Sequence, residues 1–172
     1  MKKYLVLVPC IFFVLLASAQ RGFGFDLGLS TSKAPMLAVK YYIDKNAPSI
    51  GFSYTLFNDM LGEKKELAFG DTAIGSGWVF YTWDIGYTRV LSDRFSISAE
   101  FSFGQKKQYQ NIRDDNAPSG GYHRYIDQKS VAGVGGLLLF NINQTFGLFA
   151  GYNSIREGTF GLEVRLFKDQ EY

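Results

Sequence analysis

Residues 94–104 read RFSISAEFSFG, and this stretch decides the fold. Bulky apolar residues from Phe95 to Phe103 alternate with serine, glutamate and glycine. Side chains of a β-strand point in turn to opposite faces, so the stretch predicts a strand with one apolar and one small, polar face. Two environments suit that pattern. The rings face either the core of a soluble protein or the lipid around a barrel with a wet interior.

The beginning of the chain predicts export. Two lysines, an apolar run and a small-residue site precede Gln20, which is the pattern of a secretory signal peptide cleaved after Ala19. We therefore expect a signal peptide at residues 1–19 and a single barrel domain at residues 20–172. The one cysteine, Cys10, lies in the signal, so the exported chain forms no disulfide.

Charge and aromatic content narrow the class of protein. The chain has 18 Lys and Arg against 16 Asp and Glu, and removal of Lys2 and Lys3 with the signal leaves 16 of each. A formal charge of zero does not indicate a nucleic-acid binder, and we expect no nucleic-acid partner. Aromatic residues make up 17% of the chain. A soluble domain would have to bury rings of that total bulk.

The alternation of residues 94–104 recurs along the chain and predicts eight strands. After Gln20 no stretch approaches the length of about 20 apolar residues that a membrane helix needs. One predicted strand, residues 128–140, has three leucines in a row at 137–139, which leaves open the direction in which its side chains face. The other seven strands show a clean period of two, at residues 23–29, 37–43, 50–56, 79–87, 94–104, 146–152 and 160–166.

The connections between these strands differ in length. Tight turns are predicted at residues 44–47, 91–93 and 141–144, and polar loops of about 20 residues at 58–77 and 105–127. Short turns at one end and long loops at the other, with an even number of strands, are typical of an outer-membrane barrel.

The two faces of the strands favour the membrane alternative. The polar face is mostly Gly, Ser and Thr with few charges, whereas the outside of a soluble barrel would carry many. The opposite face carries rings too bulky for the interior of eight strands. We therefore expect the rings to face lipid, with aromatic girdles at the membrane interfaces formed by Tyr41, Trp78, Tyr81, Trp83, Tyr87 and Tyr152.

Over about residues 21–167, this pattern resembles the small eight-stranded outer-membrane β-barrels of Gram-negative bacteria. The resemblance implies an all-β, antiparallel up-and-down barrel in the cell outer membrane. It also implies contact with outer-membrane lipid, lipopolysaccharide and the barrel assembly machinery. Such barrels often end on an aromatic residue that closes an alternating last strand. Here the alternation ends at Phe167 and KDQEY follows.

Charged residues on the predicted inner face suggest a structural interior rather than a reactive one. Buried charges need partners, so we expect a salt-bridged plug that does not conduct solutes as a porin does. A proton-transfer or binding site is the alternative. The predicted lumen network consists of Asp26, Lys40, Asp84, Glu100, Glu163 and Arg165.

The sequence offers few candidates for chemistry. The only histidine, His123, falls in a predicted loop without a neighbouring serine, which argues against catalysis, and no cofactor or metal is expected. The adjacent acids Asp114 and Asp115 are interpreted as solvated. Asp71-Thr72-Ala73 matches an O-glycosylation pattern, which makes Thr72 a possible acceptor.

We therefore expect a non-catalytic outer-membrane barrel that contacts an unknown protein or glycan through its long loops. A narrow channel for small or apolar molecules is one alternative. A lipid-modifying enzyme and a soluble, lipocalin-like periplasmic binding barrel are the others.

Overall fold

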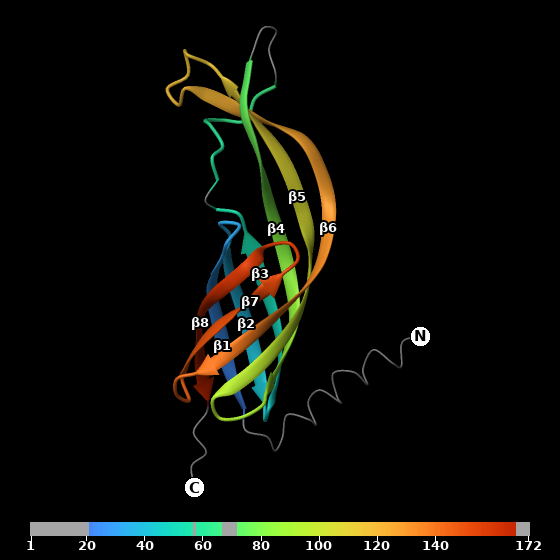
Figure 1. Cartoon of the computed structure of the whole chain (residues 1–172), viewed down its shortest axis with the longest axis vertical. Helices are drawn as coiled ribbons and strands as arrows, with labels where there is room; N and C mark the ends of the chain where they lie inside the picture. The colour runs from blue at the N-terminus through green and yellow to red at the C-terminus, as the bar shows by residue number, and fades with distance from the viewer. Residues whose placement is uncertain (1–20, 57, 67–71, 168–172) are drawn as a thin grey trace, which may run out of the picture.

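The computed structural model describes residues 21–56, 58–66 and 72–167, which form a closed ring of eight antiparallel strands (Figure 1). Each strand pairs with the next, and β1 closes the ring on β8 from Gly22↔Phe167 to Ser30↔Thr159. The predicted fold is confirmed. The strands are β1 (Arg21–Ser30), β2 (Pro35–Ile43), β3 (Asn46–Tyr54), β4 (Thr72–Val90), β5 (Phe95–Arg113), β6 (Gly121–Asn141), β7 (Phe146–Asn153) and β8 (Glu157–Phe167).

The two ends of the chain, residues 1–20 and 168–172, lie outside this description. The signal peptide at residues 1–19, with its cleavage site between Ala19 and Gln20, is outside the described residues. Among the described residues, no helix is long and apolar enough to cross a membrane.

The rings of residues 94–104 face outward. Phe101 is 47% exposed on the outer wall, whereas its neighbour Ser102 is 0% exposed and faces the barrel interior. The same division holds around the ring, because every strand contributes exposed large apolar side chains to the outside. Closure leaves no unpaired backbone edge in this apolar wall, which is what hydrocarbon requires of a spanning structure.

The interior of the barrel also contains a small apolar cluster. The three consecutive leucines of β6 divide between the faces, since Leu137 and Leu139 are buried inside and Leu138 is 57% exposed outside. The two inner leucines belong to a cluster with Met36, Ala38 and Phe149. The facing that the sequence left open is thereby fixed.

Glycines make room for the ring of Phe149 in this interior. A Cβ atom added at Gly28 or Gly161 would lie 2.8 or 2.5 Å from Cζ of Phe149. The ring of Phe149 therefore occupies space that only a glycine wall leaves free, which explains why glycine rather than serine occurs on the inner face there.

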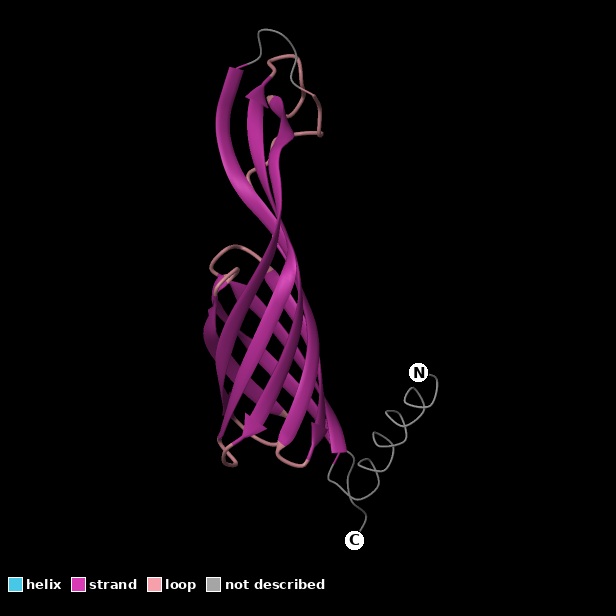
Figure 2. Cartoon of the chain, turned by 90° about the vertical axis from the view of Figure 1, so that its right-hand side faces the viewer, coloured by secondary structure: helices cyan, strands magenta, loops and turns pink. Residues whose placement is uncertain are grey.

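Three strands continue far beyond the ring (Figure 2). Pairing of β3 with β4 ends at Tyr54↔Tyr81, and pairing of β6 with β7 ends at Gly135↔Asn153. Above these points β4, β5 and β6 continue to pair with one another, and an isolated bridge joins His123 of β6 to Lys64. We call residues 72–80, 105–113 and 121–130 the extension. Nine residues of β5 correspond to a reach of roughly 30 Å.

The extension corrects the loop prediction. Residues 72–77, 105–113 and 121–127 were expected in polar loops, but they form β-strands. The error has a physical cause. Beyond the closed ring there is no wall with an apolar outer face and a polar inner face, so these strands lack the alternation of apolar and polar residues on which the prediction depended.

Candidate functional site

The lower half of the barrel interior holds a neutral charge cluster. Lys40 Nζ lies 2.9 Å from Asp26 Oδ2 and 2.9 Å from Glu163 Oε1. Glu163 also pairs with Arg165 and accepts a hydrogen bond of 2.5 Å from the Tyr42 hydroxyl. All of these side chains are buried. Two cations face two carboxylates, so each charge has an opposite partner where water is scarce.

A second cluster above it depends on Arg156, which the sequence analysis missed. Arg156 lies in the connection between β7 and β8, and its fully buried side chain enters the barrel from above. Its Nη1 lies 2.6 Å from Asp84 Oδ2, and its Nη2 pairs with Glu100. Asn153 donates a hydrogen bond of 2.8 Å to Glu100. The connection therefore closes the upper end of the barrel.

A charge count could have revealed Arg156. The predicted lumen set has four carboxylates but only two cations, Lys40 and Arg165. Buried carboxylates need opposite charges, so an excess of two acids indicates a missing base. Strand alternation did not find the missing arginine because Arg156 is in a connection rather than on a strand face.

The six predicted lumen residues are thus divided between the two clusters, and the space between the clusters is very small. A cavity of about 10 Å³ is lined by residues that include Asp26, Lys40, Asp84 and Glu100. That volume corresponds to about one water molecule.

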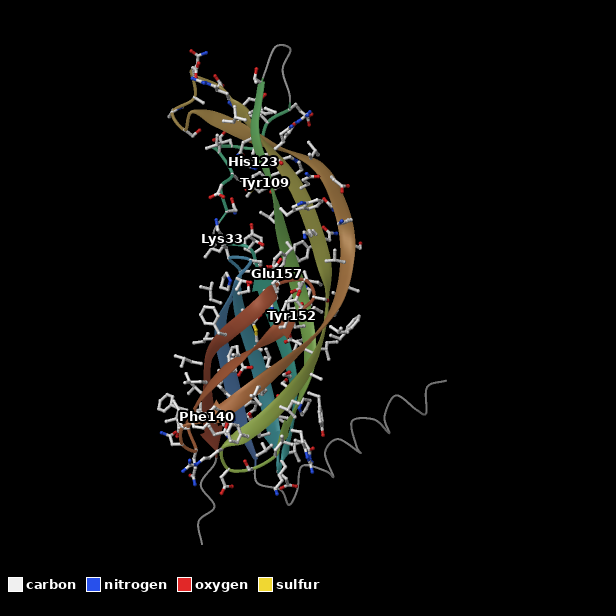
Figure 3. All side chains as sticks on the ribbon, in the orientation of Figure 1. Lys33, Tyr109, His123, Phe140, Tyr152 and Glu157 are labelled. Carbon is white, nitrogen blue, oxygen red and sulfur yellow. The ribbon has the colours of Figure 1, made fainter. Side chains whose placement is uncertain are left out.

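The predicted interfacial aromatic residues do not all have the same surroundings. Trp83, Tyr87 and Tyr152 are exposed on the outer wall, and Tyr41 and Tyr81 are partly buried. Figure 3 shows Tyr152 near the upper rim of the barrel. Trp78 differs, because it belongs to the extension and its position in β4 puts it on the opposite face from Tyr81 and Trp83. The Nζ atoms of Lys106 and Lys129 lie 5.1 and 4.9 Å from its ring centre.

One face of the extension is covered by residues 58–66, which we call the strap. Leu61 N donates to the side chain of Asn111, and Asn111 Nδ2 donates to Asp59 O at 2.7 Å. The strap also pairs with the backbone of His123 through Glu63 O and Lys65 N. These contacts hold the strap across β5 and β6.

His123 is a buried residue of β6 rather than a solvated loop residue, which corrects the expectation. Its Nδ1 lies 2.9 Å from Leu61 O. Because a carbonyl oxygen only accepts, Nδ1 carries the hydrogen and donates the hydrogen bond. Figure 3 shows both His123 and Tyr109 in the upper part of the molecule. A structural role in holding the strap accounts for its contacts.

The strapped face combines lysines with tyrosines. Lys64 and Lys107 lie 5.5 and 5.4 Å from the ring centre of Tyr125, and Lys65 lies 5.9 Å from that of Tyr122. Partial burial raises the pKa of the Tyr125 hydroxyl above its usual value. The positive charge of this face comes from the three lysines.

The outer end of the extension carries the predicted glycosylation acceptor Thr72 and the adjacent acids Asp114 and Asp115. Thr72, the first residue of β4, is exposed and lies opposite Arg113. Arg113 donates a hydrogen bond of 2.8 Å to Asp115, which raises the pKa of the guanidinium. Within the described part of the chain, no group of His, Cys, Asp and Glu has an arrangement that could hold a metal ion.

Comparisons with known proteins found no matching family model and no matching curated protein. Similar solved structures include Ail, the attachment invasion locus protein of Yersinia pestis, at 14% identity and a TM-score of 0.49, covering 87% of this chain and 97% of Ail. The N-terminal β-barrel domain of Pseudomonas aeruginosa OprF has 13% identity and a TM-score of 0.44, covering 87% and 100%. Neisserial surface protein A has 10% identity and a TM-score of 0.41, covering 86% and 94%.

At such low identities these likenesses concern the fold alone. The position in the membrane follows from the chain itself, because a closed wall with apolar side chains outside and paired charges inside is suited to lipid and not to water. The chain is an eight-stranded β-barrel of the outer membrane, with a salt-bridged interior and a three-stranded extension on one side.

Proposed function

We propose that this barrel has a structural and surface-interaction role, in which the membrane-embedded ring holds the extension at the cell surface for contact with a protein or glycan. One observation carries the proposal. Three strands continue for about nine residues beyond the ring, whereas the ring itself is filled by two charge clusters. A chain that only had to fill a membrane would not need strands of this length.

The alternatives have less support. A channel for small or apolar molecules would need a continuous path, and the cavity between the two clusters has room for about one water molecule. An enzyme that modifies lipid would need a nucleophile activated by a base, and among the hydrogen bonds of the described residues the His123 ring contacts the carbonyl of Leu61 rather than a serine or threonine hydroxyl. We therefore favour a role without catalysis, cofactor or metal.

The partners that we propose follow from where each surface lies. The apolar wall contacts outer-membrane lipid, and the barrel assembly machinery inserts the chain. The basic, tyrosine-rich strapped face is the surface that we assign to an external protein or glycan, since aromatic and cationic side chains are enriched where proteins bind partners. Lipopolysaccharide is a further partner at the rim. Thr72 remains a proposed O-glycosylation site, exposed at the start of β4.

The experiment measures binding by the extension and insertion of the barrel into the membrane separately. In one variant an Asn-Gly turn replaces residues 107–124, which removes the outer part of the extension and leaves the ring intact. We expect the variant to show the same shift in gel mobility on boiling as the parent protein, but to lose binding to arrays of extracellular proteins and glycans. A variant that no longer inserts, or that binds the arrays as the parent does, would contradict the proposal. Conductance of the parent protein in planar bilayers would favour the channel.

A further inference from the structure

Two lysines stand directly opposite each other on neighbouring strands of the extension. Lys106 of β5 is the register partner of Lys129 of β6. Like charges in such cross-strand positions destabilise a sheet. Elsewhere in the barrel the charges of facing strands are combined with opposite charges, as Lys40 is with Asp26. The lysine pair therefore requires a specific explanation.

No carboxylate of the described residues compensates this pair. The ion pairs formed by the described residues involve other side chains. Asp127 lies two positions from Lys129 on the same strand, opposite Gln108, and pairs with neither lysine. Within the described part of the chain, two positive charges thus lie side by side without a carboxylate partner.

The two ammonium groups converge on one ring. Both Nζ atoms lie about 5 Å from the centre of the Trp78 indole, at 5.1 and 4.9 Å, and Trp78 is still 37% exposed. A cation–π contact weakly stabilises each charge but neutralises neither. The two lysines are register partners on neighbouring strands and both approach the same indole, so their positive charges gather around one ring.

We propose that Trp78, Lys106 and Lys129 form a binding site for a phosphate or sulfate group carried by a cell-surface saccharide. Lysine ammonium groups are compact point charges with several donors, and a tetrahedral oxyanion offers acceptors in all directions. Binding replaces the repulsion between Lys106 and Lys129 with two charge-assisted hydrogen bonds. This inference specifies one class of partner for the extension, so it rests on the proposed function of the extension as a displayed binding surface.

The site is distinct from the strapped face. The lysines of the strapped face contact Tyr125 and Tyr122, whereas Lys106 and Lys129 contact Trp78 on the opposite side of the sheet. Replacement of residues 107–124 removes much of the strapped face but leaves Trp78, Lys106 and Lys129 in the chain. Loss of external binding and loss of anion binding can therefore be measured separately.

Binding is measured by NMR, from the chemical shifts of the indole N–H groups of Trp78 and Trp83. The protein is refolded in a zwitterionic detergent and titrated with inorganic phosphate, then with chloride at the same ionic strength. We expect a saturable shift of the Trp78 signal with phosphate, no comparable shift with chloride, and little change for Trp83 in the barrel wall. The K106Q/K129Q variant should bind phosphate at least 10-fold more weakly. A matched control, K33Q/R113Q, removes two exposed cations that already pair with Asp59 and Asp115, and it should bind normally.

Two further titrations test which kind of molecule carries the bound phosphate or sulfate group. A phosphorylated oligosaccharide from lipopolysaccharide and a sulfated polysaccharide are compared at equal anion concentration, and tighter binding of either one than of inorganic phosphate supports a saccharide ligand. Equal shifts with chloride, unchanged binding in K106Q/K129Q, or no gain from the saccharides would overturn the proposal.

Folding of the variants is checked independently. The temperature at which the gel mobility shifts should rise with phosphate in the parent protein and not in K106Q/K129Q, because only the parent has a repulsion to relieve. A phosphate effect of equal size in both proteins would also overturn the site, whatever the spectra show.

Discussion

Three strands of the barrel wall, β4, β5 and β6, continue into the extension, where their surroundings differ. Within the ring, β5 alternates between exposed apolar and buried polar residues, as at Phe101 and Ser102. Above the ring, the same strand carries Lys106, Lys107 and Gln108, all partly buried. The antiparallel pairing of β5 with β4 and β6 continues through both parts, with irregularities in the extension at Ala73/Gly75 and at Gln108/Tyr109. Solvent, rather than backbone pairing, therefore determines which side chains each half can carry.

The first prediction concerns the arginine in the barrel interior and should have the largest effect. Arg156→Met leaves Asp84 and Glu100 buried without their cation, so we expect the free energy of unfolding to fall by about 3–5 kcal/mol. Urea unfolding in lipid vesicles measures it. The matched change in the extension, Arg124→Met, removes hydrogen bonds to Gln110 and should cost no more than about 1 kcal/mol. Equal losses would mean that the interior charges are well hydrated.

The second prediction locates the lipid boundary. Phe101→Arg puts a charge on the lipid-facing wall and should lower the free energy of unfolding by about 2–4 kcal/mol. Ile74→Arg makes the same chemical change at an exposed residue of the extension, where water can solvate it, and should change stability by less than about 0.5 kcal/mol. Insertion yield in vesicles and urea unfolding give both values. A large cost at Ile74 would show that membrane covers the extension as well.

The third prediction compares two glycines. A Cβ atom at Gly161 would lie 2.2 Å from Leu27 O and 2.5 Å from Phe149, so Gly161→Ala should destabilise the barrel by about 1–3 kcal/mol. A Cβ atom at Gly75 in the extension meets nothing within 4 Å, so Gly75→Ala should be close to neutral. The stabilities of the two variants are compared by the temperature of heating at which the gel mobility of each changes. If both behave alike, packing inside the barrel is looser than these contacts indicate.

The smallest predicted effect concerns the strap. Asn111→Ala removes its two hydrogen bonds to Asp59 and Leu61, and we expect a local cost of about 1 kcal/mol. Amide hydrogen exchange should accelerate at Leu61 while the exchange of barrel amides stays unchanged. Faster exchange throughout the ring would contradict the view that ring and extension are separate units of stability.

Much of the ring could be derived from the sequence. Alternation at residues such as Phe101 and Ser102 indicates which side chains share a face, because the period of a strand is two. The small polar face and the bulky apolar face together indicate lipid outside, since rings of that size do not fit inside eight strands. The charges on strands, for example Lys40 and Glu163, were assigned to the interior by the same rule.

The tertiary structure alone decided the rest. Arg156 enters the interior from a connection, and no periodic rule describes where a connection folds. The extension lies beyond the closed ring and carries no alternation of apolar and polar residues, so its strands were expected as loops. The pairing of Lys106 with Lys129, and their convergence on Trp78, depends on register between strands. Sequence determines the two faces of each strand through local geometry, whereas contacts between distant segments depend on register and on the path of connections, which local geometry does not encode.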